Sequence, residues 1–376
     1  MSELRTRPEH ATTPAVVSRG KIVAMAIVAG AVITNVYCIQ PILPLIKGSL
    51  GVGVTTVDLV AAAALLGFST GLALLLPLGD RFDRRKLVLG QIGLAFSFAL
   101  LAVFAPSIRL LIPASFGLGM VSCVPQQLVP FAAVMSRPED RGRSVGTVAS
   151  GIMVGILLGR TVAGVVGAAF GWRAVYGVEA AFMVPVFVAA AALLPRGVPS
   201  TDLSYGRLLA SLWPLARDNR PIRESMLVQA LLWACFNAFW VNLAALLATG
   251  PWHLGSAWAG GFGIIGAAGA FAASLTALVI GVVVLDIGVQ AGLVSNQTRA
   301  FAVDPKAQGR INSLYMTATF FGGAVGTVIS GWLMARYGWE GIVAFGIALG
   351  VVASAAHWVG ARRNSKQSLG VAPAQS

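Results

Sequence analysis

Residues 138–172 read PEDRGRSVGTVASGIMVGILLGRTVAGVVGAAFGW, and residues 305–339 read PKAQGRINSLYMTATFFGGAVGTVISGWLMARYGW. The two stretches align without gaps at one offset of 167 residues, which pairs Pro138 with Pro305 and Gly171 with Gly338. Three further glycine pairs share that offset: Gly155 with Gly322, Gly159 with Gly326, and Gly164 with Gly331. In each stretch a basic loop leads into a glycine-rich apolar run. The shared offset indicates that the chain contains two copies of one structural half.

The composition predicts that lipid is the solvent for much of the chain. Of its 376 residues 57% are hydrophobic and 11% are charged, far below the charge of a soluble domain. The net charge of +13 does not indicate nucleic acid, because the basic residues lie between long apolar runs. Cys38, Cys123 and Cys235 fall inside such runs, as packing thiols do. We expect no metal, cofactor or enzymatic activity, since no metal-ligand spacing, catalytic triad or phosphate-binding loop is present.

Ten apolar runs are long enough to cross a bilayer, which takes about 20 residues of helix. They lie near residues 22–46, 57–78, 87–105, 110–135, 144–169, 174–194, 225–249, 256–297, 313–335 and 341–360. Most of the 27 basic residues fall in the termini and in every second loop between the runs. Since cytoplasmic loops carry the excess of Lys and Arg, this pattern predicts that both termini are cytoplasmic, in a protein of the cell (inner) membrane.

These runs divide the chain into five segments. We expect a disordered N-terminus at 1–20, a six-helix bundle at 21–195, a cytoplasmic linker at 196–224, a second bundle at 225–361 and a cytoplasmic tail at 362–376.

The second bundle is shorter than the first. In the first bundle Gly155 lies about 133 residues after the start of the first apolar run, whereas in the second Gly322 lies about 98 residues after it. The difference of about 35 residues is the length of one span and its loop. The run at 256–297 is too long for one crossing and too glycine-rich to be rigid. We expect 256–275 to stay near the outer leaflet while 277–297 crosses, which gives ten crossings. The alternative is a hairpin, which gives eleven and places Arg299 outside.

The loop Leu76-Pro77-Leu78-Gly79-Asp80-Arg81-Phe82-Asp83-Arg84-Arg85-Lys86 resembles the acidic and basic signature of the major facilitator superfamily. Asp80, Arg81, Arg84 and Arg85 match that signature, whereas Leu76 and Asp83 stand where the family has glycine. The resemblance implies an all-α membrane protein of two pseudo-symmetric helical bundles, with ten or eleven crossings in place of twelve. It also implies that this loop controls the conformational equilibrium.

Two further stretches resemble bacterial efflux permeases of the same superfamily. They are the first-run sequence 35–44 and the stretch 285–290 with 295–299. The sequence 159–164 resembles the antiporter motif of the superfamily, with Arg160 where proline is commonest. The glycines Gly155, Gly159 and Gly164, with their partners Gly322, Gly326 and Gly331, let helices pack closely.

Ionisable groups inside the membrane are costly, and their retention indicates function. Asp286 and Glu179 are the candidates for proton coupling, and Arg160 is a candidate for holding an anionic group or neutralising Asp286. Polar residues of the same runs are cavity candidates, with Trp240 a weaker one: Asn35, Gln40, Gln126, Gln127 and Asn237.

The function we predict is secondary active transport of a small organic solute, as export coupled to proton entry, by a monomer in membrane lipid. A solute channel and a sensor or transport-dead relic are the alternatives.

Overall fold

The computed structural model describes residues 17–195, 203–249, 273–304 and 307–369, and within them every regular element is helical. Residues 1–16, 196–202, 250–272, 305–306 and 370–376 lie outside it, and with them most of the predicted N-terminal tail and of the segment at 256–275. The elements are α1 (Arg19–Tyr37), η1 (Gln40–Ile42), α2 (Leu43–Leu50), α3 (Val54–Arg81), α4 (Arg84–Val103), α5 (Ile108–Val121), α6 (Val124–Val134), η2 (Pro138–Asp140), α7 (Arg141–Phe170), α8 (Trp172–Leu193), α9 (Tyr205–Ala210), α10 (Leu212–Asp218), α11 (Arg220–Thr249), α13 (Ala273–Phe301) and α14 (Gln308–Leu369).

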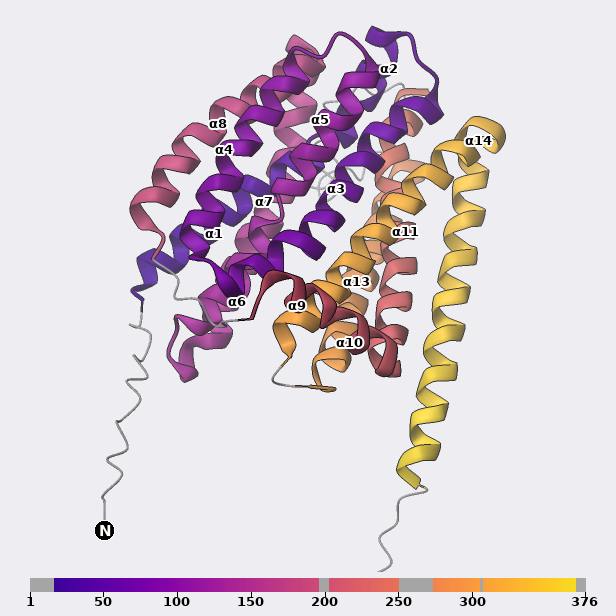
Figure 1. Cartoon of the computed structure of the whole chain (residues 1–376). Coiled ribbons are helices and arrows are strands. Elements are labelled where there is room, and N and C mark those ends of the chain that lie inside the picture. The colour runs from indigo at the N-terminus through magenta and orange to yellow at the C-terminus, as the bar shows by residue number, and fades with distance from the viewer. Residues whose placement is uncertain (1–16, 196–202, 250–272, 305–306, 370–376) are drawn as a thin grey trace, which may run out of the picture.

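The helices of the described residues make ten crossings. The described residues hold nine helical stretches that are long and apolar enough to span a bilayer. The last one, Gln308–Val359, has 52 residues, and as one rod it would be about 78 Å long. It bends at Gly338, whose φ of 62° and ψ of −153° are not helical, so α14 forms two antiparallel legs (Figure 1). Gly171 makes the equivalent turn between α7 and α8 with a φ of 83°.

We call the end of the bundle where α4, α7, α11 and α14 begin the basic end, because Arg84, Arg141, Arg220 and Arg310 lie in the first turns of these helices. The opposite end carries the connections from α2 to α3 and from α7 to α8 and the bend of α14 (Figure 1).

Helices α11 and α13 run antiparallel. The carboxylate of Glu224 accepts from Arg299 at 2.6 Å near the basic end, and Trp240 donates to Asp286 at 3.2 Å further along. Arg299 therefore lies at the end where α11 begins, as ten crossings require; an eleventh would place it at the opposite end.

The same close helix contact occurs in both copies of the repeat. A Cβ atom on Gly155 of α7 would overlap the backbone of Gly30 on α1, and one on Gly322 of α14 would overlap the backbone of Ala230 on α11. Ala230 follows Gly30 by 200 residues, whereas Gly322 follows Gly155 by 167. The two contacting residues are thus 33 residues closer in sequence in the second copy than in the first. This difference agrees with the shortening of about 35 residues expected from the sequence.

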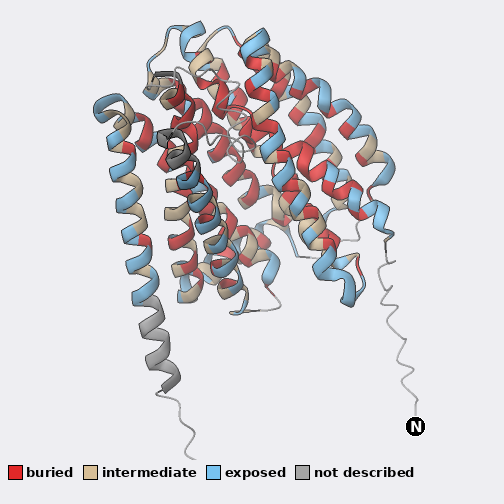
Figure 2. Cartoon of the chain, turned by 180° about the vertical axis from the view of Figure 1, so that it is seen from behind, coloured by how far each residue is buried: buried red, intermediate tan, exposed pale blue. Residues whose placement is uncertain are grey.

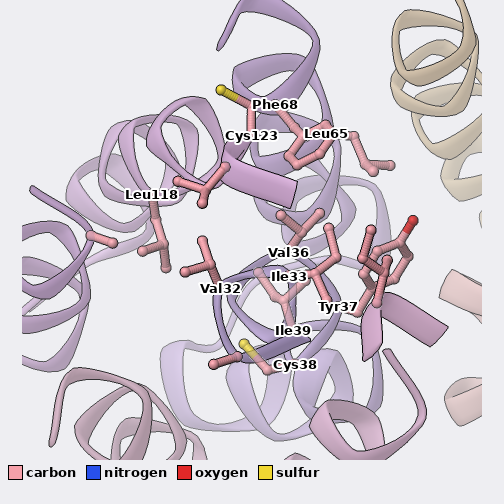
Figure 3. Packing of buried hydrophobic residues seen from close by; sticks show 14 of the residues in the cluster. Val32, Ile33, Val36, Tyr37, Cys38, Ile39, Leu65, Phe68, Leu118 and Cys123 are labelled. Atoms are coloured by element: carbon pink, nitrogen blue, oxygen red, sulfur yellow. The ribbon is translucent and has the colours of Figure 1, made fainter. Parts of the chain in front are cut away.

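Apolar side chains fill the inside of the N-terminal helices and also face outward. Val32, Val36, Phe68 and Leu118 meet where α1, α3 and α5 pack together (Figure 3). The second leg of α14 is largely exposed, with Ile347 and Val351 each 63% accessible (Figure 2). Exposed apolar surface of this extent is what a lipid solvent allows.

The predicted linker contains two short helices, α9 and α10, and α11 begins at Arg220, inside the range 196–224. The Tyr205 hydroxyl of α9 donates to the carbonyl oxygen of Leu74 on α3 at 2.8 Å. This contact ties the connection between the halves to the basic end.

Candidate functional site

Arg160 of α7 lies between the two halves, in the half of the bundle further from the basic end. Its guanidinium carbon is 4.0 Å from the ring centroid of Trp240, 5.0 Å from Tyr37 and 5.8 Å from Phe236. Tyr37 belongs to α1, whereas Phe236 and Trp240 belong to α11. The charge is therefore held by aromatic faces from both halves, which attract a desolvated cation.

Gln40 completes this cage. Arg160 Nε donates to the Gln40 side-chain oxygen at 2.9 Å. Gln40 sits in this position because α1 ends at Tyr37 and Pro41 starts the short helix η1, which turns the chain back toward α7. Arg160 is 4% accessible, and its Nη2 has no hydrogen-bond partner among the described residues.

Asp286 approaches the cage from α13. Its carboxylate accepts from the indole N–H of Trp240 at 3.2 Å, so the same indole offers its face to Arg160 and its N–H to Asp286. Within the described residues Arg160 and Asp286 form no direct ion pair. The two charges predicted to neutralise each other are thus coupled through one tryptophan.

A cleft of about 340 Å³ opens between the halves at the basic end. Gln126 and Gln127 of α6 line one wall, and Gln297 of α13 and Asn312 of α14 line the other. The side chain of Gln127 also contacts its own half, because it donates to Gln91 of α4 at 3.0 Å. At the opposite end η1 and α2 pack against α11. The halves also meet beside the cleft, where α3 packs against α14 and Ser313 donates to the carbonyl oxygen of Leu72 at 2.8 Å.

Glu179 lies elsewhere, inside the N-terminal helices. It accepts from the hydroxyl of Thr34 at 2.6 Å, and both line an apolar groove of about 560 Å³ formed by α1, α7 and α8. Asn35 donates to Met183 of α8 at 3.6 Å. Asn237 donates to the carbonyl oxygen of Trp233 at 2.9 Å and lies beside Gly323 of α14. The structure does not bring these three residues to the Arg160 cage.

The predicted control loop packs against its own half. Arg84 donates to the carbonyl oxygen of Gly79 at 3.0 Å and lies over the Phe131 ring, while Arg85 donates to Ala191 of α8. Arg81 lies over Phe82 at the surface. The side chain of Asp80 lies outside the described part of the structure.

Sequence reasoning missed three residues of this interface. Tyr37 and Phe236 give no signal, because an aromatic residue in an apolar run is ordinarily a packing residue. Asp58 is an ionisable residue at the start of a span, which is a signal that was available. It is 3% accessible, lies against Gly331 of α14, and its Oδ2 has no hydrogen-bond partner among the described residues.

The described residues contain no group of three or more His, Cys, Asp or Glu side chains placed to hold a metal ion.

Known proteins match this chain in sequence and in fold. Residues 25–255 match the family profile of the Major Facilitator Superfamily. The transporter YgaY of Escherichia coli O157:H7 is 33% identical over 95% of this chain and 98% of its own length. SCO4007 of Streptomyces coelicolor, described as a transporter, is 28% identical over 82% of this chain and 80% of its own.

Among solved structures, the peptide transporter POT in complex with sulfate has the same fold. Its TM-score is 0.73 at 12% identity, over 93% of this chain and 97% of that one. The chain belongs to the major facilitator superfamily and is a multi-pass membrane transporter, not an enzyme.

Proposed function

We propose that this transporter is proton-coupled and moves a small organic solute by alternating access between its two halves. The observation that carries the proposal is the contact between Arg160 of one half and Trp240 of the other, with Asp286 bonded to the same indole. A contact across the interface that depends on one carboxylate can link a proton to a conformational change.

The basic end is the cytoplasmic end in this proposal, because positive charge is retained inside. Both termini are then cytoplasmic, and the cleft faces the cytoplasm. The halves correspond to residues 21–195 and 225–361, joined by the linker 196–224. In the proposed motion they rotate as rigid bodies relative to each other, so that one end of the interface opens as the other closes. Such motion about a fixed central site is how repeats of this kind give alternating access.

Asp286 is the proposed proton carrier. As a carboxylate it accepts from Trp240 and holds the ring against Arg160, which favours closure of the outer end. Protonation weakens that bond, because a bond to a charged acceptor is worth about 1.5–3 kcal/mol and one to a neutral acceptor about half as much. The outer end then opens more readily. A neutral Asp286 also avoids a charge in the membrane, which costs at least about 2.5 kcal/mol.

Two modes of coupling fit a single proton site. Export against proton entry is the mode that residues 159–164 predict by their resemblance to an antiporter motif. Movement of solute together with the proton is the other. They differ in which face of the membrane must be acidic to drive accumulation.

The test uses the purified chain in proteoliposomes with an imposed pH gradient and a panel of labelled organic solutes. Asp286→Asn is expected to abolish gradient-driven accumulation while solute exchange without a gradient survives. Glu179→Gln, the rival candidate, is expected to keep driven accumulation because Glu179 is bonded inside its own half. Glu340→Gln, at an exposed position of α14, is the control for loss of a carboxylate.

Flux that saturates with solute concentration indicates a carrier, whereas flux that does not saturate indicates a channel. Flux no higher than that of protein-free liposomes indicates a transport-dead relic. The proton role of Asp286 is wrong if Asp286→Asn accumulates solute as the wild type does.

A further inference from the structure

We infer that the transported solute is a small organic anion, with a carboxylate that binds Arg160 and a flat apolar body. The inference rests on the proposed transport site, and it adds the charge and shape of the solute.

The first argument is that Arg160 has unused binding capacity. Its Nε is bonded to Gln40, but its Nη2 has no hydrogen-bond partner among the described residues although the side chain is 96% buried. A guanidinium offers two parallel N–H donors that match the two oxygens of a carboxylate. A buried cation without a direct counter-ion gains more from such a partner than an exposed one does.

The second argument is the shape of the surroundings. Tyr37, Phe236 and Trp240 present ring faces to Arg160 from two helices. When the halves separate at this end, these faces are released from the guanidinium and can stack on a planar apolar group attached to the carboxylate.

The third argument is the charge of the cleft at the basic end, the part of the space between the halves that is open in this structure. The cleft between the halves is lined by Arg84 and Arg310 and by amides, and its described lining contains no acidic side chain. A narrow entrance of one sign concentrates ions of the opposite sign. Because Arg84 and Arg310 lie on opposite halves, this field attracts an anion into the space between them.

The fourth argument links the anion to the proton. A carboxylate bound to Arg160 would share that guanidinium with Asp286, since Arg160 lies on the face of the indole whose N–H Asp286 accepts. A deprotonated Asp286 therefore repels the anion, and a protonated one admits it. By reciprocity the bound anion raises the proton affinity of Asp286. Proton and anion are then bound and carried together, in the same direction, and export by exchange does not fit a solute of this charge.

Few other ionisable groups face this cluster from the elements packed around α13. Tyr37 of α1 lies beside Arg160, and Tyr315 of α14 donates to the carbonyl oxygen of Leu293 at 2.8 Å. The charged residues of α11 gather at the basic end, where Glu224 is paired with Arg220 and Arg299. The pH dependence of anion binding is therefore assigned to Asp286.

The test measures binding to the full chain in lipid nanodiscs by calorimetry, with benzoate, benzamide and benzylammonium as probes. Benzoate is expected to bind at least about tenfold tighter than the other two, the worth of one bond to a charged group. Its affinity falls as pH rises from about 5.5 to about 8, and in weak buffer its binding takes up a proton. Asp286→Asn binds benzoate tightly at every pH and takes up no proton.

Arg160→Gln is expected to bind benzoate and benzamide equally, whereas Arg143→Gln, at an exposed position near the start of α7, preserves the discrimination. If Arg160→Gln does not fold, Arg310→Gln in the cleft serves instead, and slower benzoate association at low salt is the expected result.

Equal affinity for the three probes, a preference for benzylammonium, or benzoate binding that is unaffected by pH overturns the inference. Proton-driven accumulation of a neutral or cationic solute would also overturn it while leaving the proposed proton coupling in place, so the two failures are distinguishable.

Discussion

Arg160 is a buried cation held by aromatic rings and an amide in place of a carboxylate. Three ring faces and the Gln40 oxygen surround it, and the acid beside it, Asp286, accepts from the N–H edge of Trp240. Cation–π contacts are worth about 2 kcal/mol or more when desolvated, less than a well-formed buried ion pair. The arrangement stabilises the charge enough to bury it, yet leaves the contact easy to break.

Trp240 can be tested apart from the two charges. Trp240→Phe keeps an aromatic face for Arg160 but removes the N–H that Asp286 accepts. We expect gradient-driven transport to fall about tenfold or more, since a bond to a charged acceptor is worth about 1.5–3 kcal/mol. Solute affinity should change less. Initial rates of driven uptake and of exchange measure both. An unchanged driven rate would show that the indole does not link the two charges.

At the residue scale the sequence names candidates, but it does not show where their side chains point. The cost of a charge in the membrane identified Arg160, Glu179 and Asp286. Nothing in a helical run shows that Glu179 turns to Thr34 inside its own half whereas Asp286 reaches Trp240. Burial and tertiary packing decide this, and a single sequence carries neither.

Among the elements, the closest contacts join α1 to α7 and α11 to α14 through glycine. Gly155→Leu would place a side chain into the backbone of Gly30. We expect a loss of about 1–3 kcal/mol of stability, the usual cost of overpacking, and a lower midpoint of thermal unfolding in detergent. Gly146→Leu on the same helix is the control, because a Cβ there meets nothing within 4 Å. Equal midpoints for the two variants would contradict the packing described here.

The loop between α3 and α4 is expected to set the conformational equilibrium. Arg84 and Arg85 fasten it to its own half, and the cleft at the basic end lies beside Arg84. Asp80→Asn should slow turnover and leave the dissociation constant of the solute nearly unchanged. Turnover and equilibrium binding on the same preparation check this. A large loss of affinity at normal turnover would assign the loop to solute binding instead.

The glycines at two helix turns repeat in the sequence as they do in the backbone. The sequence pairs Gly171-Trp172 with Gly338-Trp339, and both glycines adopt positive φ between antiparallel helices. Only glycine adopts that conformation readily, so the repeat in the sequence became a repeat in the backbone. The helices α9 and α10 were not anticipated, because six or seven residues give too few turns for a periodic signal.

For the whole molecule, the first described helix begins at Arg19 and the last ends at Leu369, both at the same end of the bundle (Figure 1). A cysteine at Ser365 is expected to react with a membrane-impermeant maleimide only after the cells are opened, because the basic end is the proposed cytoplasmic end. Val52→Cys, at the opposite end beside the Gly51 turn, is the matched site that should react in intact cells. Labelling of the Ser365 site in intact cells would reverse the proposed orientation.

The number of crossings could be predicted from the sequence, because the length and hydropathy of the apolar runs and the distribution of basic residues each constrain it. The placement of the halves could not. Whether the cleft opens at the basic end or at the opposite end depends on tertiary contacts such as that of Arg160 with Trp240. A protein that alternates between the two conformations has one sequence for both, so the sequence does not select between them.

Alternating access governed by Asp286 is tested most directly by two distances across the interface. Pulsed electron resonance on spin labels at Lys86 and Gly309 reports the basic end, and labels at Ser49 and Arg336 report the opposite end; all four positions are exposed. Native Cys38, Cys123 and Cys235 are first replaced. In Asp286→Asn, which mimics the protonated state, we expect the basic-end distance to shorten and the opposite-end distance to lengthen in the same sample. Distances that match the wild type at both ends, or that change in the same direction, would contradict the account.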